Sequence, residues 1–258
     1  MCYLNLKDGV NFQWHDLLVE ANGLVFDLFV FGVLLSIYEA LRSKKERIER
    51  YLEEIEDYRG WDEKEASYRI VGLLRRLFKE GVTRINLSGC NLSGQYLANL
   101  DLRKCILNNT NLSHADLSNI NLAGANLSRA NLCGANLSGT NLSGANLSGA
   151  NLCSANLSGT NLSGANLANA NLSKAYMSGI NLPGANLSGL DISEADLSKA
   201  NLSGANLSQS NLAGVNFSGA NLSGANLFRS ALSGHESMYN YFLDEEDREE
   251  IEYSEDFY

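Results

Sequence analysis

The sequence is poor in the residues from which most active sites are built. Its 258 residues include only three histidines and five cysteines, and no group of them has the spacing of a zinc site. No pair of carboxylates stands beside a nucleophile or a base in a segment that would form a cleft. We therefore expect no catalytic residue, no metal ion and no cofactor, and the composition favours a protein that is not an enzyme.

Charge is also scarce between residues 85 and 234. Five acidic and six basic side chains leave this stretch almost neutral, and the net charge of −10 arises mainly from the last twenty-four residues. A protein that imitates duplex DNA needs a dense array of negative charge, because the duplex carries about one charge per 1.7 Å of its axis. The near-neutral stretch argues against such mimicry, and no direct binding to nucleic acid is expected.

What the chain has in abundance is a five-residue repeat. Thirty units follow one another over residues 85–234 without an insertion, most commonly as Ala-Asn-Leu-Ser-Gly. The central position is Leu in every unit except three, where Met177, Ile192 and Phe217 replace it. The small residue and the Leu are two positions apart, so both can point to one side of a short strand, and Ser-Gly suits the corner that follows. A chain that turns a corner every five residues winds into a solenoid whose coils stack about 4.8 Å apart.

The repeated Leu is predicted to fill the axis of this solenoid. Burial of each aliphatic side chain contributes about 1.5–3 kcal/mol, which offsets much of the ordering entropy of a glycine-rich chain. Cys90 and Cys105 occupy the small inward position and are expected to fill the core as compact side chains. The predicted central core comprises Leu127, Leu132, Leu137, Leu142, Leu147 and Leu152.

This pattern resembles the pentapeptide-repeat family, whose consensus is matched unit by unit over residues 85–234. The resemblance implies an all-β solenoid, a right-handed quadrilateral β-helix with four units in each coil. Thirty units would then make about 7.5 coils and a rod roughly 36 Å long. The resemblance also implies a role without catalysis, and for some members the imitation of DNA in binding type II topoisomerases. A soluble topoisomerase binder is therefore the alternative function, which the neutral charge of the repeats disfavours.

Coils of twenty residues would place positions twenty apart in columns on the outer surface. Cys133 and Cys153 would stack near the Cα spacing of a disulfide, although a reducing cytosol would keep them as thiols. Lys174 and Glu194 would stack as an exposed ion pair worth under about 1 kcal/mol. The candidate contact surface for an unidentified protein partner consists of Tyr96, Tyr176, Arg129 and Arg229.

The first part of the chain, residues 1–41, contains an apolar stretch over 21–41. As a helix this stretch would be about 31 Å long, enough to cross a bilayer core, although Asp27 interrupts it. The basic side chains that follow, beginning with Arg42, favour a cytoplasmic location for the rest of the chain. The sequence therefore predicts a single-pass membrane anchor. The alternative is a helix that packs in a cap or binds a partner, within a cytoplasmic protein.

Residues 42–84 are predicted to form a helical linker and an N-terminal cap. A heptad-like apolar stripe runs through the linker, and a second amphipathic helix is expected over 65–80. This second helix would cover the open end of the solenoid, whose exposed edge would otherwise pair with another chain. Alternatively, the heptad-like stripe forms a short two-stranded coil, which would make the protein a homodimer.

After the repeats, residues 235–258 form an acidic and aromatic tail. Its apolar residues over 238–243 are expected to fold back on the last coil, and the acidic remainder is expected to stay solvated. Together these segments predict a non-enzymatic scaffold or protein-interaction rod, tethered to the cytoplasmic face of a membrane.

Overall fold

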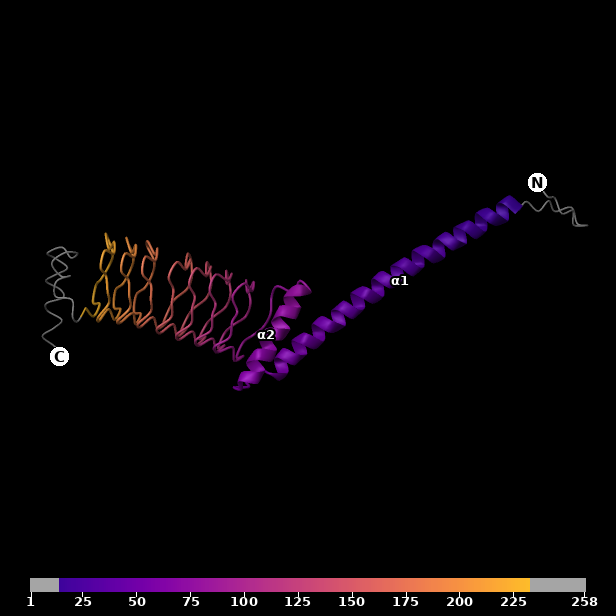
Figure 1. The fold of residues 1–258 in the computed structure, drawn as a ribbon. Helices are drawn as coiled ribbons and strands as arrows, with labels where there is room; N and C mark the ends of the chain where they lie inside the picture. The colour runs from indigo at the N-terminus through magenta and orange to yellow at the C-terminus, as the bar shows by residue number, and fades with distance from the viewer. Residues whose placement is uncertain (1–13, 233–258) are drawn as a thin grey trace, which may run out of the picture. The chain divides into compact units, whose positions relative to one another are not determined.

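The computed structural model describes residues 14–232 (Figure 1). Helix α1 spans Trp14–Asp57 and helix α2 spans Lys64–Lys79, and the repeats follow as short bridged segments joined by turns. The backbone divides into two compact units, residues 1–50 and residues 51–258. The predictions made for the tail over 235–258 fall outside the described residues.

The repeats form a β-solenoid with a period of twenty residues. Parallel bridges join Asn-position residues to those twenty positions later, from Asn86 with Ile106 to Asn211 with Ala231, with two exceptions described below. Each bridge joins positions twenty residues apart, and each repeat unit has five residues, so one coil contains four repeat units. The handedness and the total number of coils stay predictions.

A regular unit is held by two short-range hydrogen bonds, as residues 121–125 show. The side-chain Oδ1 of Asn121 accepts a hydrogen bond from the amide of Ala123 at 3.1 Å, and the amide of Ala125 donates to the carbonyl of Leu122 at 2.9 Å. Between them, Gly124 has a φ of 65°. A positive φ costs glycine little because it has no Cβ, which explains why most units carry glycine at this corner.

Neighbouring coils are joined by a backbone ladder and by a parallel ladder of asparagine side chains. The amide of Leu137 donates to the carbonyl of Asn156 at 2.8 Å, and the amide of Asn136 donates to the carbonyl of Ala115 at 2.9 Å. Nδ2 of Asn156 also donates to Oδ1 of Asn136 at 3.3 Å. Inside these ladders the solenoid axis is filled by fully buried leucines, among them Leu127, Leu132, Leu137, Leu142, Leu147 and Leu152.

Helix α2 covers the first coil of the solenoid (Figure 1). Leu87 and Leu92 belong to this terminal coil, yet both have 0 % exposure, so another element must shield them from water. Helix α2 lies at this end of the solenoid, and its buried residues are Ala66, Ser67, Ile70, Val71, Leu73, Leu74 and Leu77. Polar contacts also fix the cap, because Nδ2 of Asn91 donates to Oδ1 of Asp62 at 2.7 Å.

The predicted membrane-spanning helix over residues 21–41 is not supported. Helix α1 continues through this stretch as far as Asp57, and no helix among the described residues is both long and apolar enough to cross a membrane. Asp27 and Glu39 confine the run without charged side chains to residues 28–38. This run is about 16 Å of helix, roughly half of the thickness of a bilayer core.

Candidate functional site

The ladder between coils is interrupted at one position in the repeats. Asn161 forms no bridge with Asn181, and Asn166 forms none with Asn186, although the series of bridges is continuous on both sides of this position. The asparagine side-chain ladder is interrupted there as well. Asn161 and Asn166 donate to the preceding coil, at 3.4 Å and 3.2 Å, but receive no such bond from Asn181 or Asn186.

On this side, the same two coils also lack the backbone hydrogen bonds that join other coils. One coil earlier, the amide of Leu142 donates to the carbonyl of Asn161 at 2.8 Å, whereas the equivalent amide of Leu162 has no backbone acceptor in the described structure. The ladder resumes where Leu172 donates to Asp191 at 2.7 Å. Around this interruption, the amides without a cross-coil acceptor are those of Gly159, Leu162, Gly164, Leu167 and Asn169 on one side, and Asn181, Asn186 and Asp191 on the other.

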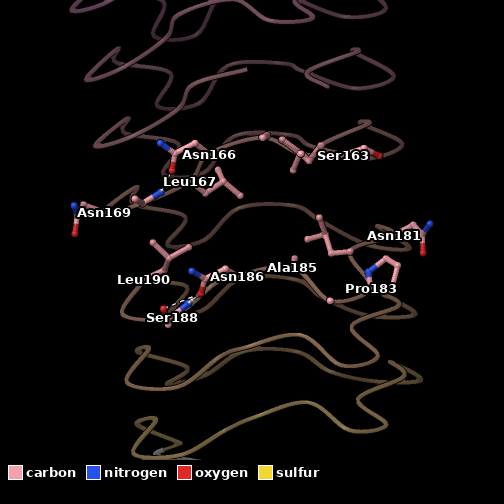
Figure 2. A pocket seen from close by; sticks show the side chains of 16 residues that line it. Ser163, Asn166, Leu167, Asn169, Asn181, Pro183, Ala185, Asn186, Ser188 and Leu190 are labelled. Carbon is pink, nitrogen blue, oxygen red and sulfur yellow. Dashed lines mark hydrogen bonds between the residues drawn. The ribbon is translucent and has the colours of Figure 1, made fainter. Parts of the chain in front are cut away.

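The separation of these coils opens a cavity of about 540 Å³, which we call the coil gap (Figure 2). Leu162, Leu167 and Leu182 form its aliphatic base and are 5–6 % exposed, in contrast to the fully buried leucines of the regular coils. The polar side chains at the opening are those of Ser163, Asn166, Asn169, Asn181, Asn186 and Ser188. None of the residues that line the coil gap is charged. The coil gap is therefore a neutral site with an apolar base and a hydrogen-bonding rim.

The single proline of the chain, Pro183, lies in one wall of the coil gap. In a regular unit the amide at this position donates to the preceding asparagine side chain, as Ser163 does to Asn161 at 3.0 Å. Pro183 has no amide hydrogen, so Asn181 cannot hold its own corner in this way. The Oδ1 atom of Asn181 accepts a hydrogen bond from Nδ2 of Asn201 at 2.9 Å. The unit at Pro183 thus lacks one of the two bonds that hold a regular corner.

Charged side chains of the repeats lie outside the coil gap. Arg103 binds both carboxylate oxygens of Asp101, with an Nη2–Oδ2 distance of 2.6 Å, and these hydrogen bonds lower the pKa of Asp101. The ion pair that the sequence predicts between Lys174 and Glu194 forms at 3.5 Å with both side chains exposed. The five acidic and six basic side chains of the described coils almost balance, so the net charge there is small.

The four cysteines in the described residues have two different environments. Cys133 and Cys153 are joined as a disulfide, with their Cα atoms 4.7 Å apart, so the prediction that they remain thiols is wrong. Equivalent positions of adjacent coils stack directly, which brings the two sulfur atoms together. Cys90 and Cys105 are free and buried, and burial raises the pKa of the Cys90 thiol to about 11. A thiol with this pKa is a poor nucleophile at neutral pH.

The residues of the predicted contact surface lie apart from the coil gap. Tyr96 and Tyr176 are exposed and share one column of the solenoid, four coils apart. Arg129 and Arg229 occupy the corner position of a second column, and the guanidinium of Arg229 lies 4.9 Å from the ring centroid of Phe228. The structure therefore does not bring these four residues into one patch. The coil gap was not predicted from the sequence, in which its one local signal is Pro183.

These features define a β-solenoid protein built from five-residue units. A family model described as pentapeptide repeats matches the chain in eight copies, over residues 85–124, 120–159, 150–189, 160–198 and 191–227. The matched residues make up more than half of the chain, which therefore belongs to the pentapeptide-repeat family, as the sequence predicts.

Several solved structures of pentapeptide-repeat proteins are similar to this chain. One is HetL, involved in heterocyst differentiation regulation in the cyanobacterium Nostoc sp. strain PCC 7120, with 29% identity over 63% of this chain and 94% of its own, at a TM-score of 0.28. A protein of the Arabidopsis thaliana thylakoid lumen has 31% identity over 48% of this chain and 72% of its own, at a TM-score of 0.30. QnrB1, a plasmid-mediated fluoroquinolone resistance protein, has 21% identity over 60% of this chain and 86% of its own, at a TM-score of 0.34. A search of curated protein sequences finds no match.

Proposed function

We propose that this protein is a non-enzymatic interaction scaffold that binds an extended peptide segment of a partner protein in the coil gap. The observation that supports the proposal is the interrupted ladder between residues 159–170 and residues 178–191. The regular coils on either side would hold the two walls as a rigid frame. The partner would be recognised by its backbone and by the small size of its side chains.

The hydrogen-bonding pattern of the walls favours a peptide as the ligand. An amide or carbonyl that is shielded from water without a partner costs about 1–3 kcal/mol, so the walls gain from any ligand that pairs with them. An extended peptide offers donors and acceptors in the alternation that a strand edge requires, and it can bind as an added strand. The wall that contains Leu162 and the wall that contains Asn186 each present backbone donors and acceptors with which a repeat unit pairs in the regular coils. A segment in the conformation of a repeat unit could therefore pair with both walls.

The side chains that line the coil gap restrict the sequence of the bound segment. Leu162, Leu167 and Leu182 would contact small or aliphatic side chains, while the asparagines of the rim would bind amide and hydroxyl groups. A charged side chain would have no partner among the lining residues, and burial of an unpaired charge is unfavourable. The expected segment is therefore uncharged. The low net charge of the described coils gives no support to binding of a topoisomerase by imitation of DNA.

Hydrogen exchange followed by mass spectrometry tests this proposal on the full chain. Amides within residues 159–169 should exchange faster than those of the matched segment 139–149, where Leu142, Gly144, Leu147 and Gly149 donate to the next coil at 2.7–2.9 Å. The probe is a synthetic peptide with the sequence of residues 141–150, Asn-Leu-Ser-Gly-Ala-Asn-Leu-Ser-Gly-Ala. It should slow exchange in residues 159–169 and leave residues 139–149 unchanged.

A backbone N-methylated version of this peptide is the matched control, because it keeps the side chains and lacks the amide donors. It should give no protection. Equal exchange in the two segments of the free protein would show that the ladder is closed in solution. Fast exchange in residues 159–169 that no amount of the unmodified peptide slows would reject the coil gap as a peptide site.

A further inference from the structure

The apolar part of α1 exposes large side chains throughout residues 25–41. Their exposure ranges from 38 % at Val30 to 68 % at Phe29, and the set comprises Val25, Leu28, Phe29, Val30, Phe31, Val33, Leu34, Leu35, Ile37, Tyr38 and Leu41. At roughly 200 Å² for a large apolar side chain, the exposed area is on the order of 1,000 Å². The largest apolar patch on a typical monomer is about 300–600 Å², and a stable dimer buries about 800 Å² on each partner. The exposed area is therefore sufficient for a protein interface.

Exposed apolar side chains lie around the whole circumference of this segment. Among them, Val30, Leu34, Ile37 and Leu41 follow one another at the alternating intervals of four and three residues that form a coiled-coil seam. The face opposite this seam contains Leu28, Phe29 and Leu35 and also the polar side chains of Ser36, Glu39 and Ser43. Both hydroxyls donate to carbonyls of the helix itself, Ser36 to Gly32 at 2.9 Å and Ser43 to Ala40 at 3.0 Å. Because α1 is already helical over Trp14–Asp57, pairing along the seam requires no new helix nucleation.

Two charged residues continue the seam at its ends and have opposite signs. Asp27 lies three residues before Val30, and Lys44 lies three residues after Leu41. In a parallel pair each seam residue meets its own copy, so Asp27 would face Asp27 and Lys44 would face Lys44. In an antiparallel pair with Leu34 opposite Ile37 of a second copy, Val30 lies opposite Leu41 and Asp27 lies opposite Lys44. Opposite charges at the seam specify orientation and register in coiled coils, because like charges repel.

We propose that α1 forms an antiparallel homodimer through residues 27–44, with Asp27 of each copy paired to Lys44 of the other. Phe31 and Tyr38 lie beside the seam on the same side, so the antiparallel arrangement also brings Phe31 of one copy near Tyr38 of the second. Lys44 is partly buried and also interacts within its own chain. Its ammonium group has three N–H donors, so it can bind a carboxylate of the second copy in addition.

Sedimentation analysis of the full chain over a wide range of protein concentrations tests the proposal. The unchanged protein should form a dimer. Either Asp27→Lys or Lys44→Asp alone places like charges opposite each other at both ends of the dimer interface. Each single variant should raise the dimer dissociation constant at least about tenfold. The double variant Asp27→Lys/Lys44→Asp restores opposite charges only in the antiparallel arrangement, so it should recover the affinity of the unchanged chain. Glu39→Lys, on the opposite face, is the matched control and should have no effect.

A mixture of the two single variants gives a second measurement that does not depend on the double variant. Asp27→Lys and Lys44→Asp have complementary charges, so they should form a heterodimer that neither forms as a homodimer. A chain that is monomeric at all concentrations, or a dimer that the single variants do not weaken, would overturn the proposal. A double variant that stays monomeric while the mixture dimerises would overturn the antiparallel orientation.

Flotation with neutral phosphatidylcholine vesicles tests whether the apolar part of α1 binds a lipid surface instead of a second copy of the chain. Binding of the monomer to these vesicles, with no dimer in their absence, would contradict the proposal. None of these variants lies in the coil gap, so a failure of the dimer would leave the peptide-binding function separately testable.

Discussion

Replacement of Leu137 by alanine should destabilise the solenoid strongly. Leu137 is fully buried and lies in the axial column between Leu117 and Leu157, which are also fully buried. The coil cannot close over the lost volume easily. Its backbone is held on one side by the bond from Leu137 to Asn156 at 2.8 Å and on the other by the bond from Asn136 to Ala115 at 2.9 Å.

The expected loss of stability has two parts. Removal of three buried carbon groups costs about 2.4 kcal/mol at about 0.8 kcal/mol for each. If about 50 Å³ remains open between the coils, the cavity adds about 1.2 kcal/mol at about 24 cal/mol per Å³. We therefore expect the free energy of unfolding to fall by about 3–4 kcal/mol, within the range measured for buried leucines.

Urea unfolding followed by circular dichroism measures this change. Leu137→Met keeps the volume of the side chain and serves as the control, with an expected loss of less than about 1.5 kcal/mol. A loss below about 1 kcal/mol for Leu137→Ala would refute the reasoning, because it would mean that the coils collapse onto the space or that Leu137 does not support the stack.

Three further predictions concern the disulfide, the cap and a buried thiol. Cys153→Ser opens a link across twenty residues and should lower stability by about 3 kcal/mol, while Cys133 becomes reactive to a thiol reagent in the folded protein. Arg59→Ala should lower the melting temperature in calorimetry by loosening the first coil, because the guanidinium of Arg59 donates to the backbone carbonyl of Ser88 and binds Glu56. The hydrogen bond from Arg59 lowers the pKa of Glu56, so its stabilising effect is present above the ordinary glutamate pKa of about 4.3 and is lost as the pH falls below that value. An acid titration of the melting temperature should show a step there that Arg59→Ala removes, and no difference between the two titrations would contradict this. Cys90, with a pKa of about 11, should resist alkylation at neutral pH until the protein is unfolded, and fast labelling of the native chain would show that it is not buried.

The regular part of the solenoid follows from local sequence. Leu and a small residue two positions apart point inward, Ser-Gly forms a corner, and the strict spacing of five residues repeats the same geometry along the chain. The twenty-residue period then places Lys174 beside Glu194 and Cys133 beside Cys153, so these contacts could be predicted from numbering alone. The prediction of a membrane-spanning helix over 21–41 is not supported, because Asp27 and Glu39 shorten its uncharged run to residues 28–38.

By itself, the sequence determined the repeating unit, the near-neutral surface and a resemblance to the family, which in turn implies the twenty-residue register. Only the tertiary structure decided where the stack is interrupted. Asn161 and Asn166 have the same residue type as their counterparts in the bridged coils, so no residue pattern distinguishes a paired coil from an open one, and Pro183 marks only one corner of the coil gap. Whether two coils meet depends on the balance of many weak bonds along both edges, and that balance is a property of the whole stack rather than of any single unit.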